Sequence, residues 1–321
     1  MKDLPTWKLV RSSLQRQLPV MLMLVVESSG SSPGRPGFLM AVNILGEMQG
    51  SLGGGIMEHK FTELARVKLH NGVREVTLFK QVHNSTAPSN RSGMICSGEQ
   101  TNLLYFVTQN EYDSVDAVIT CFEEGRQGLL AITPAKIDCL AGNHSTNNIS
   151  FSRVDETHWC YTQTIGYPNR LYIVGGGHCS LALSRIMSQL DFYVVLVEER
   201  PNLKTMNENV FANEKQVVED YKSLSTHIPP GENHYVAIMT FGYRSDAIAL
   251  QALEGKQFRY LGVLGSQAKI DKMFMELYGE TKSKEKLREI HAPIGLPINS
   301  HTPEEVAVSI AAEIIRVKNG V

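Results

Sequence analysis

Leu171-Tyr172-Ile173-Val174-Gly175-Gly176-Gly177-His178 places a short apolar run directly before three glycines. The pattern predicts a buried strand that ends in a tight turn and leads into a helix. Glu198 stands at the end of the next apolar run, Tyr193 to Val197. This order matches the dinucleotide fingerprint, in which glycines let the backbone approach a pyrophosphate and the acid accepts from a ribose hydroxyl. The match is incomplete, because Ser180 stands where the third glycine belongs.

Strands and helices alternate on both sides of this stretch. The pattern predicts strands at 171–174, 193–197, 235–240 and 260–264, and helices at 181–190 and 246–253. Apolar strands that alternate with helices are typical of a parallel sheet covered on both faces. We therefore predict a Rossmann-like parallel α/β domain over residues 166–321.

The first half of the chain has a different pattern. A helix at 4–17, a buried strand at 20–26 and further strands and helices predict a mixed α/β domain over residues 1–165, including connecting strands at 110–165. The polar stretch Ser28 to Gly37 is rich in turn residues, and we expect it to lie at the surface. The fold class is therefore α/β, with a mixed N-terminal domain before the Rossmann-like domain.

Composition excludes several classes of protein. The chain has 321 residues, of which 42% are hydrophobic and 20% charged, with a formal net charge of -2, which favours a folded globular protein and argues against nucleic-acid or anionic membrane partners. No apolar run reaches the roughly 18 residues that a membrane-spanning helix needs. The five cysteines include no C-x-x-C pair, so a reducing, cytoplasmic environment fits best.

A second glycine-rich segment, Gly50-Ser51-Leu52-Gly53-Gly54-Gly55, precedes a predicted helix that carries Glu58. Backbone N–H groups of consecutive glycines before a helix can hold an anion, and the Ser51 hydroxyl adds a donor. Glycines of this kind also make tight turns without any ligand.

Cys96 lies in a polar loop, followed by Ser97 and Gly98. A thiolate there could be a soft metal ligand or a sulfur carrier, whereas the alternative is a small buried hydrophobic residue. We find no Ser, His and Asp arrangement typical of nucleophilic catalysis, so no residue is assigned a catalytic role. Binding of a cofactor, rather than catalysis, is the favoured activity.

These segments together resemble the XdhC/CoxI family, the xanthine dehydrogenase accessory proteins. The resemblance rests on blocks in the same order along nearly the whole chain: Val26–Gly37, Gly50–Glu58, the Cys96 loop, Val174–His178, Val197–Arg200, Tyr260–Lys269, His291–Leu296 and Thr302–Ile314. The chain departs from the usual family pattern at Ser97, Phe241, Gln267 and Ala268, where the family often has a glycine, a histidine and a basic pair.

The resemblance implies a cytoplasmic chaperone that binds the molybdenum cofactor (molybdopterin), supports its sulfuration with a cysteine desulfurase and inserts it into a xanthine dehydrogenase-like apoenzyme. It also implies a homodimer, and it implies that the thiol of Cys96 meets molybdenum or its sulfur. The residues expected to bind the cofactor are Ser51, Gly53, Gly54, Gly55, Glu58, Cys96, Gly98, Gly175, Gly177, His178, Glu198, Arg200, Gly265, Ser266 and Lys269.

Two alternatives use the Rossmann-like domain alone. One is an NAD(P)-dependent oxidoreductase, in which Glu198 would favour NAD because an acid repels a 2′-phosphate. The other is a nucleotide-sensing regulator that catalyses nothing.

Overall fold

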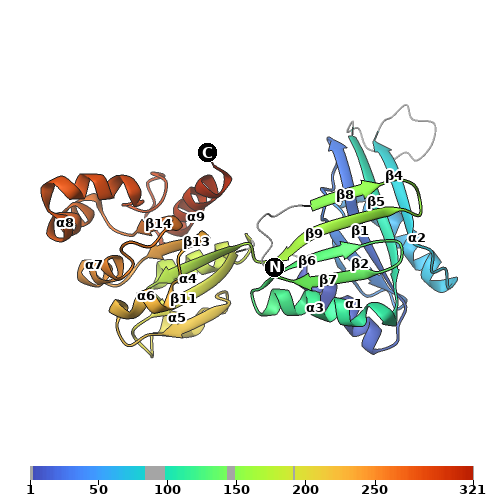
Figure 1. The fold of residues 1–321 in the computed structure, drawn as a ribbon, viewed down its shortest axis with the longest axis horizontal. Helices are drawn as coiled ribbons and strands as arrows, with labels where there is room; N and C mark the ends of the chain where they lie inside the picture. Colours follow the sequence, from blue (N-terminus) through green and yellow to red (C-terminus); the bar gives the residue numbers. More distant parts are fainter. Residues whose placement is uncertain (1–2, 84–97, 143–148, 191, 321) are drawn as a thin grey trace. The chain divides into compact units, whose positions relative to one another are not determined.

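The computed structural model describes residues 3–83, 98–142, 149–190 and 192–320 (Figure 1). The chain divides into two compact units, Met1–Gly166 and Tyr167–Val321. The second unit contains a parallel sheet of Rossmann type and the first contains two antiparallel sheets with helices, so the predicted fold class is confirmed. Within the described residues, no helix is both long and apolar enough to cross a membrane.

The second unit is built on a five-stranded parallel sheet with the order β12-β11-β10-β13-β14. The strands are β10 (Asn169–Val174), β11 (Phe192–Glu198), β12 (Glu214–Val217), β13 (Gly231–Ile238) and β14 (Phe258–Val263). The chain runs outward from central β10 through β11 and β12, then crosses to the other side of β10 to form β13 and β14. The strand order reverses beside β10. In doubly wound sheets, ligands bind where the order reverses, in a crevice outside the carboxyl ends of the strands.

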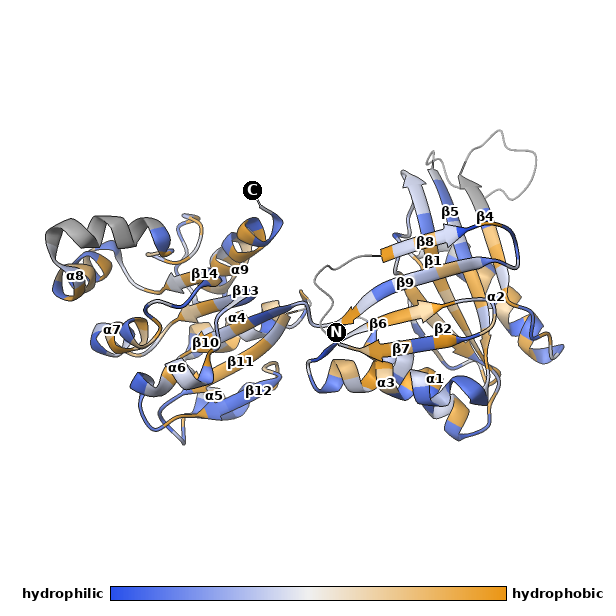
Figure 2. Ribbon diagram, in the orientation of Figure 1, coloured by the Kyte–Doolittle hydropathy of each residue, from blue (hydrophilic) through white to orange (hydrophobic). Residues whose placement is uncertain are grey.

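Helices cover both faces of this sheet. One face packs against α4 (His178–Met187), α5 (Lys204–Glu208) and α9 (Pro303–Asn319), through a cluster that includes Leu183, Met206 and Ile310. The other face packs against α6 (Leu224–His227), α7 (Tyr243–Ala252) and α8 (Gln267–Glu289), and the 3-10 turn η2 (Tyr221–Ser223) precedes α6. Figure 2 shows the apolar strands between these helices, as expected for strands buried on both sides.

The first unit has a five-stranded antiparallel sheet with the order β3-β2-β1-β5-β4. Its strands are β1 (Val20–Gly30), β2 (Leu39–Asn43), β3 (Met48–Gly50), β4 (Thr77–His83) and β5 (Gly98–Val107). The helix α2 (Gly55–His70) covers one face through Phe61, Ala65 and Leu69. The other face shares a core with α1 (Leu4–Gln15), α3 (Tyr112–Glu123) and a second antiparallel sheet.

This second sheet has the order β7-β6-β9-β8 and follows the 3-10 turn η1 (Gln109–Glu111) and α3. Its strands are β6 (Gln127–Ile132), β7 (Ile137–Ala141), β8 (Ile149–Arg153) and β9 (Trp159–Gly166). Trp159 and Tyr161 from β9 bury their rings in the shared core with α1 and α3. The sheet therefore belongs to the first unit and does not link two separate cores.

Candidate functional site

The loops that follow β10, β11, β13 and β14 all leave the carboxyl edge of the parallel sheet, because the strands run in one direction. The predicted site residues of the second unit lie in these loops, at the strand ends or in the first turn of the following helix. They are Gly175, Gly177, His178, Glu198, Arg200, Gly265, Ser266 and Lys269. The fold thus brings to one edge of the sheet residues that are up to 94 positions apart in the sequence.

The glycine loop after β10 contains one constrained and one open position. Gly175 has φ +104°, and a Cβ there would lie 2.5 Å from the carbonyl oxygen of Met239, so only glycine fits. A Cβ on Gly177 would meet nothing within 4 Å. The helix α4 then begins at exposed His178 without a side-chain cap. Its first N–H groups have no partner within the helix, and such an end attracts anions.

Glu198 is fully buried at the end of β11 and accepts hydrogen bonds from several groups. The donors are the backbone N–H groups of Gly176 (2.7 Å), Glu199 (3.0 Å) and Arg200 (2.9 Å), the Arg200 Nε (2.9 Å) and Nη2 (2.8 Å), and the Tyr221 hydroxyl (3.2 Å). Burial alone would raise the pKa of Glu198, but the hydrogen bonds from Arg200 and Gly176 outweigh it and lower the pKa to about 2. A carboxylate with so many donors has little capacity left for a ribose hydroxyl.

A second ion pair joins the loops after β13 and β14. Asp246 on α7 is fully buried, accepts from the Thr240 hydroxyl at 2.6 Å and lies 2.6 Å from the Lys269 ammonium. Lys269 also donates to the Leu264 carbonyl at 3.0 Å, so two of the three donors of its ammonium group bind partners within the protein. Gly265 lies against the Lys269 side chain, and Ser266 is exposed. Sequence reasoning missed Asp246, whose only signal is an acidic residue in the first turn of a helix.

In the first unit, Glu58 lies in the first turn of α2, and its carboxylate binds the glycine-rich loop that precedes this helix. Its Oε2 accepts from the Ser51 hydroxyl (2.6 Å) and from the backbone N–H groups of Leu52 (2.9 Å) and Gly54 (3.1 Å), and Gly53 N–H donates to Ser51 Oγ (3.1 Å). Here too a glutamate of the chain takes the donors of a glycine-rich loop. Gly55 and Glu58 also line a cavity of about 360 Å³ together with Arg66.

Gln100 on β5 joins this loop to the stretch that was expected at the surface. Its side-chain oxygen accepts from the Ser32 hydroxyl at 2.8 Å and from Gly34 N–H at 3.1 Å. Ser32, Gly34 and Gln100 are buried, whereas most of the Ser28–Gly37 stretch lies at the surface as expected. A Cβ on Gly53 would lie 2.6 Å from Gly34 N, which shows how closely the two loops pack. Sequence reasoning missed Gln100, because one polar residue in a strand carries no distinctive signal.

Gly98 begins β5 and lies against the backbone of Ser29 and Ser31, where a Cβ would come within 2.8 Å of Ser29 O. Cys96 and Ser97 lie outside the described residues, so the predicted contact of Cys96 with molybdenum or sulfur stays a prediction. Across the part of the chain that the structure describes, no group of three or more His, Cys, Asp or Glu side chains could hold a metal ion.

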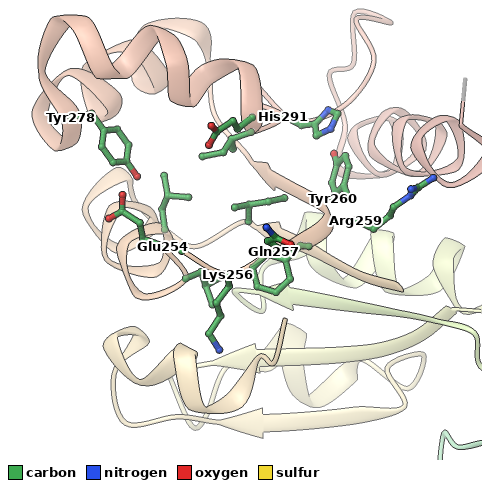
Figure 3. Close-up of a pocket in the computed structure, with 14 residues that line it drawn as sticks. Glu254, Lys256, Gln257, Arg259, Tyr260, Tyr278 and His291 are labelled. Carbon is green, nitrogen blue, oxygen red and sulfur yellow. The ribbon is translucent and has the colours of Figure 1, made fainter. Parts of the chain in front are cut away.

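A cavity of about 320 Å³ lies beside the amino end of β14 (Figure 3). Figure 3 shows the Tyr278 hydroxyl directed toward Glu254, whereas Lys256 points away from them and donates to the Ser225 and Ile228 carbonyls. Arg259 likewise donates to the Val317 carbonyl at 3.2 Å. The cavity therefore lies at the end of β14 opposite to the carboxyl edge, away from the loops described above. Its Lys256 and Arg259 side chains donate hydrogen bonds to backbone carbonyls.

Comparison with protein families matches two parts of the chain. Residues 13–79 match the XdhC and CoxI family, and residues 171–314 match the XdhC Rossmann domain. The chain belongs to the XdhC/CoxI family. The resemblance inferred from the sequence is thereby confirmed, and the second match includes every loop of the carboxyl edge described above.

Two relatives and one solved structure are similar to this XdhC/CoxI family member. A protein of Bacillus subtilis, named as a probable xanthine dehydrogenase subunit, is 21% identical over 96% of both chains. The uncharacterized protein YqeB of Escherichia coli is 27% identical over 48% of this chain but only 28% of its own length. A crystal structure described as a xanthine dehydrogenase from Bacillus halodurans has the same fold, with a TM-score of 0.74 and 22% identity over 100% of this chain and 96% of that one.

Proposed function

We propose that this chain is a maturation factor that binds the molybdenum cofactor, supports its sulfuration and inserts it into a xanthine dehydrogenase-type apoenzyme. Two observations support a xanthine dehydrogenase-type apoenzyme as the partner: membership of the XdhC/CoxI family and the full-length likeness to a probable xanthine dehydrogenase subunit. The observation that carries the binding step is the uncapped start of α4 beside Gly177. Action in the cytoplasm as a homodimer, with a cysteine desulfurase as the sulfur donor, belongs to the same proposal.

The residues at the carboxyl edge fit the phosphate of such a cofactor. The N–H groups at the start of α4 supply partial positive charge, and the space around Gly177 leaves room for an anion. The cofactor itself would supply a molybdenum ion and sulfur ligands for the client enzyme. Of the other candidate residues, exposed His178 and Ser266 have side chains available to a ligand, whereas Glu198 and Lys269 instead hold the loops in position.

The proposed binding step can be tested with Gly177→Val. Gly177 has φ -72°, which valine adopts, and a Cβ there meets open space, so the variant is expected to fold while its side chain fills the crevice. Purified wild-type chain and variant would each be mixed with molybdenum cofactor and with an apo-xanthine dehydrogenase, and bound cofactor and restored activity measured. We expect retention and activation by the wild type, both reduced at least about tenfold in the variant, with Gly177→Ala intermediate.

Parallel mixtures with NAD and NADP distinguish the alternatives. Retention of NAD without the molybdenum cofactor would contradict the proposal and favour an NAD-dependent oxidoreductase or a nucleotide-sensing regulator. The saturated carboxylate of Glu198 argues against that outcome, since the usual ribose contact needs a free acceptor. Cys96→Ser tests the thiol separately: we expect it to weaken retention of the cofactor and fail to activate the apoenzyme, and unchanged activation would remove Cys96 from the proposal.

A further inference from the structure

Phe241 stands out on the surface of the second unit. Its side chain is 64% exposed, and no other aromatic residue occurs among the large exposed hydrophobic side chains of the described residues. It lies in the loop after β13, at the carboxyl edge and next to the side of β10 where the strand order reverses. Single exposed apolar residues are common on protein surfaces, and Phe241 differs from the others by its place, at the sheet edge where doubly wound folds bind their ligands.

Arg200 covers one face of the Phe241 ring. The guanidinium carbon lies 4.9 Å from the ring centroid, within the range of a cation–π contact. The guanidinium cannot turn away easily, since its Nε and Nη2 both donate to the fully buried carboxylate of Glu198. The Arg200 guanidinium therefore packs against one face of the Phe241 ring in a fixed position. The rest of the ring is exposed to solvent.

The same carboxylate joins this ring to the glycine loop. Glu198 Oε2 accepts from both Gly176 N–H at 2.7 Å and Arg200 Nη2 at 2.8 Å, so Gly176, Glu198, Arg200 and Phe241 form one chain of contacts across three loops. The open position at Gly177 follows directly in the glycine loop. A flat apolar surface and an anion-binding helix end thus lie at one edge of the sheet.

We infer that Phe241, backed by Arg200, is a stacking platform for a planar heteroaromatic ring whose ligand also carries a phosphate group held at the start of α4. This inference rests on the proposed function and specifies which part of the ligand the second unit binds. Both a pterin and a purine nucleotide have this chemistry. Stacking of such rings on an aromatic side chain tolerates either ring system, because each offers a π face.

Isothermal titration with three phosphate esters tests the platform: neopterin phosphate, AMP and ribose 5-phosphate, the last of which has no heteroaromatic ring. We expect the wild type to bind at least one ring-bearing ester more tightly than ribose 5-phosphate. Phe241→Leu keeps an apolar side chain but loses the π face, and we expect it to weaken the ring-bearing esters by about tenfold without changing ribose 5-phosphate binding. Phe241→Tyr should restore ring binding, and Val210→Ala, at an 80% exposed position, serves as the control.

Equal binding of the ring-bearing esters by Phe241→Leu and wild type would overturn the inference, as would a wild type that prefers neither over ribose 5-phosphate. The comparison between neopterin phosphate and AMP identifies the ring source. If the wild type activates an apo-xanthine dehydrogenase but Phe241→Leu binds rings normally, the platform is wrong and the proposed function stands. If rings bind through Phe241 but the molybdenum cofactor is not retained, the platform stands and the proposed function fails.

Discussion

Glu198 and Arg200 form an ion pair in which the carboxylate is fully buried and the guanidinium side chain is 39% exposed. The pair is bidentate, with Arg200 Nε 2.9 Å from Oε1 and Nη2 2.8 Å from Oε2. The two residues are separated by a single position, so the loop after β11 folds back on the end of its own strand. This geometry fixes the loop, joins it to the glycine loop through Gly176 and directs the guanidinium toward Phe241.

Glu198→Gln is expected to destabilise the second unit by about 2–3 kcal/mol, because an amide nitrogen would face buried donors and the charge of Arg200 would lose its partner. Glu199→Gln is the matched control. Burial, together with the charges of Glu198 and Asp220, raises the pKa of Glu199, so replacing its charge should change stability by less than about 0.5 kcal/mol or increase it. Urea unfolding at pH 7 measures both, and equal losses for the two variants would contradict the assigned role of Glu198.

The acid stability of the second unit depends on Glu313 as well. Burial alone would raise its pKa, but hydrogen bonds from His291, the Tyr260 hydroxyl and Gly295 N–H lower the pKa to about 2. A depressed carboxylate pKa stabilises the folded state above the ordinary value near 4.5, and this contribution is lost as the pH falls toward 2. In Glu313→Gln the fall in unfolding free energy between these pH values should be smaller by up to about 3 kcal/mol.

Urea unfolding at several pH values between 7 and 2 checks this slope. Glu276→Gln, at an exposed position on α8 with a surface partner in Lys272, is the control and should keep the wild-type slope. An unchanged slope in Glu313→Gln would mean that Glu313 titrates normally in the folded protein.

The alternation of apolar runs predicted the parallel sheet because its central strands are buried on both faces and therefore apolar along their whole length. Edge strand β12 was missed, since Glu214-Lys215-Gln216-Val217 has one apolar residue and an edge strand needs few. The helix α9 was not assigned, although Thr302 and Glu305 form a capping box that the sequence displays. Local pattern therefore predicted the buried central strands, whereas β12 has little apolar signal and the signal of α9 was not used.

The candidate site was only partly predictable for a different reason. Glycine-rich loops identify where the backbone must take special conformations, and the structure places Gly53 and Gly175 at such positions. Which side chain satisfies the exposed N–H groups depends on long-range packing, and the sequence gives no distance between Gly34 and Gln100 or between Gly176 and Glu198. Intramolecular glutamates in both loops therefore emerged only from the structure.

Gln100→Leu tests the loop contact in the first unit. Leucine would leave the Ser32 hydroxyl and Gly34 N–H buried without their acceptor, so we expect a loss of about 2 kcal/mol in unfolding free energy. Amide hydrogen exchange should show faster exchange at Gly34 before global unfolding. Gln49→Leu, at an exposed position of β3, is the control; wild-type exchange at Gly34 in Gln100→Leu would contradict this contact.

Two glycines with positive φ differ in both backbone strain and close packing, because φ +113° at Gly53 lies outside the left-handed region that includes φ +66° at Gly72. Gly72 has φ +66° and open space around a built Cβ, so Gly72→Ala should lose only about 1 kcal/mol, the usual penalty of a left-handed alanine. Gly53 has φ +113°, and its Cβ would lie 2.6 Å from both Gly34 N and Pro33 C, which are backbone atoms that cannot rotate away. Gly53→Ala must therefore push apart the two loops that Gln100 joins, and we expect a loss of about 3 kcal/mol or more. Thermal and urea unfolding of the two variants provide the comparison. Equal losses of unfolding free energy in the two variants would contradict this expectation. They would show that the two loops move apart at no cost, so that the close packing of Gly53 on Pro33 and Gly34 does not contribute to stability.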